Sequence, residues 1–98
     1  MKPSYAVLRF SLKTLPEGKP TQEVERCGEF DTAEAAFTAA RQGALQAWRQ
    51  ERKARGSDET AKIIYIEDTE WGYDLRCENL VFTRFWIHDT SPVEISAP

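Results

Sequence analysis

The residues best suited to chemistry in this chain are Cys77, His88 and the neighbouring Asp89. A thiol, an imidazole and a carboxylate can act together as a nucleophile, a general base and the group that orients the base. Such a set works only if the side chains lie within hydrogen-bond reach of one another, about 3 Å. Whether these three residues meet therefore depends on the elements that carry them.

The segments around Cys77 and His88 are predicted to be neighbouring antiparallel strands. Residues 71–77 and 80–88 are rich in aromatic and β-branched side chains, and the intervening Glu78-Asn79 pair can form a two-residue hairpin loop. In that hairpin Cys77 opposes Leu80, and His88 lies eight residues further along the strand, about 27 Å away. We therefore assign no catalytic residue, and an enzyme is the less favoured class of protein.

Other groups that bind metals or cofactors also lack the required spacing. One acidic group carries the oxygen ligands that calcium and magnesium prefer, namely Glu67, Asp68, Glu70 and Asp74. Their spacing matches no calcium loop, and a solvated turn explains them better. The scattered glycines form no phosphate-binding loop. Cys27 and Cys77 are too few for a disulfide scaffold, so we expect a cytoplasmic protein with reduced thiols, no metal and no cofactor.

Composition and charge restrict the classes of protein further. The 98 residues suit one α+β domain, which we place at residues 1–90, and residues 91–98 are polar enough to be a flexible C-terminal tail. No apolar run approaches the length of a membrane span, so no membrane partner is expected. The net charge of −3 is unfavourable for non-specific binding of nucleic acid, which needs several cations on one surface.

The strands that complete the fold are indicated by alternation and charge. Residues 5–12 alternate strictly, which indicates a first strand, and the charged residues 21–30 fit an edge strand. Residues 61–67 are predicted to precede the hairpin as a third neighbouring strand. With the helix described next, the order is ββ-α-βββ, an α+β fold with a mainly antiparallel five-stranded sheet and one long helix packed on one face.

The helix is predicted over residues 32–55. Asp31 can cap its start, with Glu34 placed as in a capping box, and Gly56 can end it. Its inward stripe is mostly alanine, so the helix can approach a sheet that carries large side chains. The stripe contains Ala33, Phe37, Ala40, Ala44 and Trp48. Gly43 costs about 1 kcal/mol relative to alanine inside a helix, which hints at close packing or a bend.

Two assumed hairpin loops predict which side chains share a face of the sheet. With loops at Glu78-Asn79 and Asp68-Thr69, the bulkiest residues of the last three strands fall on one side, which we predict to be the seat of the helix. These residues are Ile64, Ile66, Trp71, Tyr73, Leu75, Cys77, Leu80, Phe82 and Trp86. Arg84 is expected beside Tyr73 and the tryptophans, where it can stack on a ring.

The opposite face is predicted to carry an apolar patch of Ile63, Tyr65, Phe85 and Ile87 around Gly72. One helix cannot cover both faces of a sheet, so this patch needs a further explanation. It can be a dimer interface, part of the core contributed by the first strand and loops, or a ligand surface. We favour a homodimer, formed through this face or through a strand edge.

The sequence therefore favours a non-catalytic cytoplasmic interaction or regulatory module, homodimeric or bound to a protein partner. The alternative is a role linked to nucleic acid. In one form of that alternative the basic helix end contacts phosphate through Arg49, Arg52, Lys53 and Arg55. In the other form the acidic last three strands imitate nucleic acid and inhibit a protein that binds it.

Overall fold

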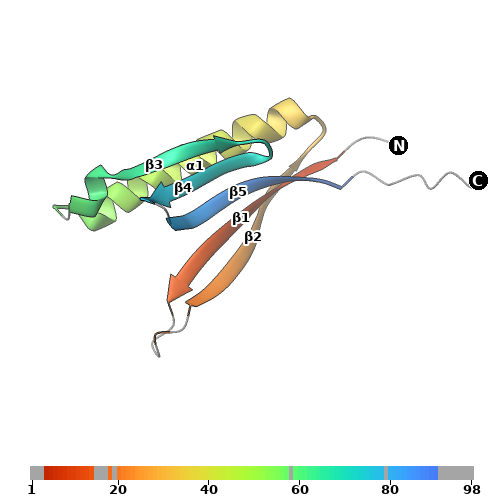
Figure 1. Ribbon diagram of the computed structural model, residues 1–98. Coiled ribbons are helices and arrows are strands. Elements are labelled where there is room, and N and C mark those ends of the chain that lie inside the picture. Colours follow the sequence, from red (N-terminus) through yellow and green to blue (C-terminus); the bar gives the residue numbers. More distant parts are fainter. Residues whose placement is uncertain (1–3, 15–17, 19, 58, 79, 91–98) are drawn as a thin grey trace, which may run out of the picture.

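The computed structural model describes residues 4–14, 18, 20–57, 59–78 and 80–90. Strands β1 (Tyr5–Thr14) and β2 (Pro20–Phe30) form a long hairpin, and helix α1 (Ala33–Arg55) follows them (Figure 1). A short 3₁₀ helix, η1 (Glu59–Lys62), leads into the last three strands. These are β3 (Ile64–Thr69), β4 (Gly72–Cys77) and β5 (Leu80–Asp89). The predicted tail at 91–98 lies outside the described residues.

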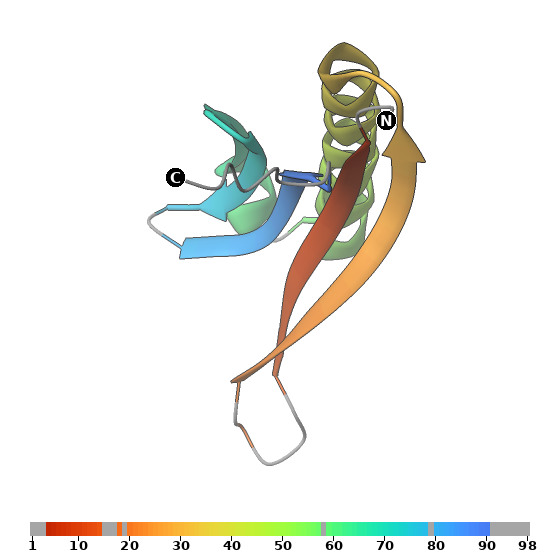
Figure 2. The ribbon, with the colours of Figure 1, turned by 90° about the vertical axis from the view of Figure 1, so that its right-hand side faces the viewer.

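All five strands belong to one antiparallel sheet in the order β2-β1-β5-β4-β3. After the helix the chain forms β3, at the edge of the sheet opposite β2. Strands β4 and β5 then follow in order toward the first hairpin, so β5 lies between β4 and β1. The helix packs on one side of this sheet, and no described element covers the other side (Figures 1 and 2). The predicted α+β fold and the edge position of β2 are confirmed.

The helix begins one residue later than predicted. Thr32, not Asp31, is the N-cap, and its hydroxyl oxygen accepts a hydrogen bond from the amide of Ala35 at 3.1 Å. With Thr32 as the cap, Glu34 is the second helical residue and not the third, so the predicted capping box does not form. The end is as predicted: Gly56 has φ +57°, and its amide donates to the carbonyl of Arg52 at 3.1 Å.

A β-bulge in β5 determines which side chains face the helix. Cys77 pairs with Leu80 and Arg76 pairs with Val81, as the predicted two-residue loop requires. The next residue of β4, Leu75, pairs with Thr83, so Phe82 is the extra residue of the bulge. Because side chains alternate along a strand, this single extra residue reverses the facing of everything in β5 beyond it.

The reversal corrects the predicted core. Phe85 and Ile87 are buried under the helix, while Trp86 lies on the opposite face, next to Leu8 of β1. In the core, Phe85 and Ile87 pack with Leu75 of β4, Val7 of β1 and four alanines of the helix. Those alanines are Ala36, Ala40, Ala44 and Ala47.

The turn between β3 and β4 also differs from the prediction. Strand β3 continues through Asp68 to Thr69, which pairs with Gly72, so Glu70 and Trp71 form the turn and the indole of Trp71 is half exposed. The register of β3 against β4 is shifted by four residues from the predicted register. An even shift keeps each side chain on its predicted face, so Ile64 and Ile66 still point toward the helix.

Two glycines mark close contacts with Phe85. A Cβ on Gly43 would lie 2.8 Å from Cε1 of the Phe85 ring, so the predicted close packing at Gly43 occurs against this ring. A Cβ on Gly72 would lie 1.9 Å from the carbonyl oxygen of Phe85. Gly72 is therefore required by the close approach of the neighbouring backbone.

The contact between Gly43 and Phe85 gives a stability prediction. In an exposed helix Gly→Ala is stabilising by about 1 kcal/mol. We expect Gly43→Ala to lower the free energy of unfolding here by about 1–3 kcal/mol instead, because the added methyl group overpacks the core against a buried ring. Urea denaturation followed by circular dichroism measures this change.

The control is the same substitution in a Phe85→Leu background, which removes the atom that Cβ would touch. There the penalty of Gly43→Ala should largely disappear. A stabilising effect of Gly43→Ala in the unmodified protein would contradict the packing described here.

Candidate functional site

The most distinctive surface is the face of the sheet that the helix does not cover, here called the open face. Its apolar part runs across the middle of the sheet, from β2 through β1 to β5. The residues that point to this side are Leu8, Phe10 and Leu12 of β1, Val24 of β2, and Val81 and Trp86 of β5. An apolar sheet face without a covering layer is the usual mark of an interaction surface.

The open face is hollowed where two strands separate. Pairing between β1 and β5 ends at Ser11 and Thr83, although β1 continues to Thr14 and β5 begins at Leu80. The β1–β2 hairpin twists away from β5 beyond this point and extends past the helix (Figures 1 and 2). The resulting groove has a volume of about 370 Å³ and is lined by residues that include Phe10, Leu12 and Trp86.

The projecting part of this hairpin, here called the arm, presents apolar side chains to solvent. Leu12 is 47% exposed and Val24 is 57% exposed. Val24 pairs with Phe10 and Gln22 pairs with Leu12, so these apolar side chains form one cluster on the open face. An exposed cluster beside an apolar groove is the feature that sequence analysis missed, although the alternation of Leu8, Phe10 and Leu12 was visible.

The charged groups of the open face are paired with one another. The guanidinium of Arg84 donates two hydrogen bonds to the carboxylate of Asp74, from Nε at 2.7 Å and from Nη2 at 2.9 Å. Asp74 is buried, and these bonds raise the pKa of Arg84 above its usual value, so the guanidinium stays charged. The same guanidinium lies 5.3 Å from the ring centroid of Trp86, so the predicted stacking occurs on a tryptophan, while Tyr73 packs against the core on the helix side.

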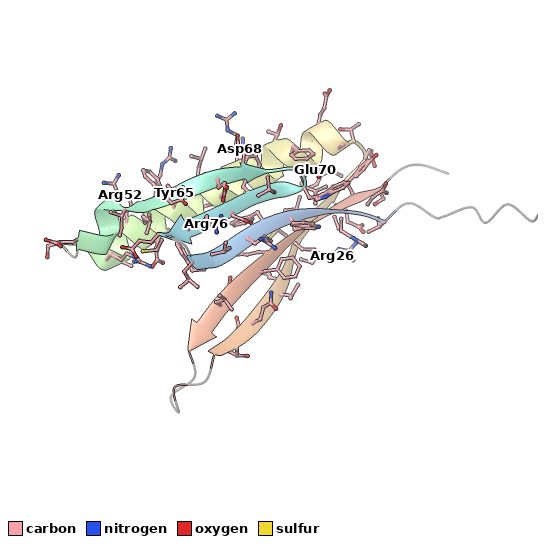
Figure 3. All side chains as sticks on the ribbon, in the orientation of Figure 1. Arg26, Arg52, Tyr65, Asp68, Glu70 and Arg76 are labelled. Carbon is pink, nitrogen blue, oxygen red and sulfur yellow. The ribbon has the colours of Figure 1, made fainter. Side chains whose placement is uncertain are left out.

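Two further ion pairs flank this central pair. Arg76 of β4 pairs with Glu67 of β3, and Arg26 of β2 pairs with Glu29 of the same strand. Figure 3 shows Arg76 and Arg26 on β4 and β2, to either side of β5. The cations of the open face are therefore matched by carboxylates, so this surface offers little net charge to a phosphate backbone.

The predicted apolar patch does not exist as one surface. Phe85 and Ile87 belong to the core, and Gly72 is buried against the backbone of β5. Ile63 and Tyr65 remain partly exposed, and the hydroxyl of Tyr65 donates to the carbonyl of Glu78 at 3.3 Å. The bulge in β5 is the reason, because it turns Phe85 and Ile87 to the helix side.

The three residues that suggested catalysis are not brought together. Cys77 lies at the loop end of β4, where its sulfur is 3.7 Å from Nη1 of Arg55. His88 is exposed near the other end of β5 and pairs with Ala6. Because the Cys77–Leu80 pairing is confirmed, the wide separation of the thiol and the imidazole follows from the register.

The basic end of the helix is partly occupied by contacts within the protein. Arg55 pairs with Glu51 through Nε at 2.8 Å and lies over the ring of Phe82. Arg52 stacks on Trp48 at 4.8 Å and points outward from the helix end, as Figure 3 shows. Arg49 and Lys53 are exposed. The four residues therefore do not present four equivalent cations to one ligand.

Within the described part of the chain, no group of three potential metal ligands gathers at one place, and no helix is long and apolar enough to span a membrane. Comparison of the chain with protein-family models, with curated proteins and with solved structures gave no match.

The pair of Arg84 and Asp74 gives a prediction about the open face. Arg84→Met should lower the free energy of unfolding by about 1–3 kcal/mol, because it leaves the buried carboxylate of Asp74 without its cation. This range is below that for a fully buried pair, since the Arg84 side chain is 42% exposed. Thermal and urea denaturation measure the change.

The matched control is Arg26→Met, which breaks an ion pair whose two side chains are both more than half exposed. It should change stability by less than about 0.5 kcal/mol. Equal effects of the two substitutions would show that the burial of Asp74 does not decide the strength of its pair.

Proposed function

We propose that this protein is a non-catalytic interaction module of the cytoplasm that forms a homodimer through the open face of its sheet. The observation that supports this proposal is the exposed cluster of Leu12 and Val24 on the arm, beside the groove at Phe10 and Trp86. Exposed aliphatic side chains next to an apolar hollow favour association, because association removes both surfaces from water.

A second copy of the chain is the favoured partner because the open face carries both a projection and a hollow. In a two-fold dimer the same patch is used by both copies, so a projection on one must meet a hollow on the other. The arm and the groove lie next to each other on one face. A two-fold rotation can therefore seat each copy's Leu12 and Val24 against the other's groove, as two layers of sheet pack in a sandwich.

The paired charges favour a protein partner over nucleic acid. Burying an unpaired charge is costly, but Arg84 and Asp74 already satisfy each other, as do Arg76 and Glu67. The face can thus be covered by an apolar surface without leaving a cation or a carboxylate alone. An RNA-binding sheet would instead need arginines whose guanidinium groups are free for phosphate.

The dimer proposal predicts a loss of association when charge is placed on the arm. Leu12→Glu and Val24→Glu should each shift the protein from dimer to monomer in light scattering at micromolar concentration, because a carboxylate would have to be buried in the interface. Both side chains are about half exposed in the isolated chain, so the fold should tolerate the substitutions.

The control variant is Ile63→Glu, at an apolar residue of similar exposure outside the open-face cluster. It should leave the dimer intact. A monomeric unmodified protein, or a dimer that survives Leu12→Glu but is broken by Ile63→Glu, would contradict the proposed interface.

The nucleic-acid alternative is tested separately at the helix end. If Arg49, Arg52, Lys53 and Arg55 contact phosphate, a labelled oligonucleotide should bind at low salt and lose affinity steeply as salt rises. We expect no such binding, because Arg55 is paired with Glu51 and the net charge is negative. Binding that is abolished by Arg49→Gln with Lys53→Gln would support the alternative.

A further inference from the structure

A second cavity lies on the helix side of the sheet, between α1 and the β1–β2 hairpin. Its volume is about 310 Å³, at the lower end of the range for small-molecule sites. The cavity exists because the helix presents Ala39, Gly43 and Ala47 toward this part of the sheet, so little side-chain volume fills the space. Val7 and Phe85 of the core form part of its apolar wall.

The cavity also contains a cation that forms no ion pair with a described carboxylate. Arg9 of β1 lines it, and the guanidinium carbon lies 5.5 Å from the ring centroid of Phe85. Among the described residues, no carboxylate lies within ion-pair distance of Arg9, in contrast to Arg84, which is held by Asp74. A partly buried guanidinium stacked on an aromatic ring presents its remaining donors in a plane that matches a carboxylate.

We propose that this cavity binds a small molecule with one carboxylate on an apolar body. The carboxylate pairs with Arg9, and the apolar body lies against Ala39, Gly43 and Ala47. The side chains of Gln46 and Gln50 also line the cavity and supply amide donors. This site lies on the opposite side of the sheet from the proposed dimer interface and does not depend on it.

The two other polar groups of the cavity define the charge that it accepts. Glu25 of β2 lies directly across from Arg9 in the β1–β2 register and lines the same cavity. Its carboxylate therefore disfavours a second negative charge on the ligand. Burial, and then the charge of Glu25, raise the pKa of the Cys27 thiol above its usual value, while Arg9 opposes this shift. The thiol therefore stays neutral at neutral pH and does not cancel the charge of Arg9.

The test uses phenylacetate as the carboxylate probe and phenylacetamide as its neutral counterpart. Each is titrated into the isotope-labelled full chain, and the amide shifts of Gly43, Gln46 and their neighbours are followed by NMR. Phenylacetate should bind with a Kd on the order of 1 mM, as expected for a ligand of this size. Phenylacetamide should bind at least about tenfold more weakly, because it cannot form the charged hydrogen bonds.

Three variants assign the binding to the cavity. Arg9→Gln should weaken phenylacetate binding by about tenfold or more, whereas Glu25→Gln should strengthen it by roughly twofold to fivefold. Arg41→Gln is the control. Arg41 is an exposed arginine of helix α1 that does not line the cavity, so its loss should leave the Kd unchanged.

The proposal is overturned if phenylacetate causes no saturable shift at the cavity up to about 20 mM. It is also overturned if phenylacetate and phenylacetamide bind the unmodified protein equally, a comparison that does not depend on any variant folding. Light scattering of the same samples reports the oligomeric state, so a failure of this site and a failure of the dimer are distinguished.

Discussion

One extra residue in β5, Phe82, decides which side chains of that strand reach the core. By inserting Phe82 between the residues that pair with Arg76 and Leu75, the chain turns Phe85 and Ile87 toward the helix and Trp86 away from it. The buried ring of Phe85 leaves no room for a side chain at position 43 of the helix, which is glycine. The backbone carbonyl of Phe85 likewise leaves no room for a Cβ at position 72 of β4, which is also glycine. The same bulge bends β5, and it lies where β5 and β1 separate.

A sheet with one helix must leave one face uncovered, and the way this face is built indicates its use. Its arginines are held by carboxylates, with the central pair anchored on the buried Asp74, so the charged part of the face is already neutral. Its apolar part is concentrated on the arm and in the adjoining groove. The helix side, in contrast, has a cavity in which Arg9 lacks such a partner. The partners that we propose for the two faces differ accordingly, a protein surface on one and a small carboxylate on the other.

The sequence predicted the elements well and the faces only in part. Alternation located β1, and the alanine stripe with Gly56 located the helix, because these signals depend on local periodicity and on backbone conformation at one residue. The register of Cys77 with Leu80 was also predictable from a two-residue loop. The bulge at Phe82 was not, since no local residue preference marks it, and a shift of one residue was enough to place Phe85 in the core instead of the predicted Trp86. The open-face cluster was missed for a second reason: whether Leu12 and Val24 stay exposed depends on where β1 parts from β5, which is a property of the twisted sheet and not of either strand alone.

If two copies meet through the open face, side chains of one chain must lie within NOE distance of the other. A sample that mixes isotope-labelled and unlabelled chains reports only contacts between copies. We expect NOEs between the methyl groups of Leu12 and Val24 in one chain and the rings of Phe10 and Trp86 in the other. The absence of such contacts, or intermolecular NOEs confined to the edge of β3 near Ile63 and Tyr65, would contradict it.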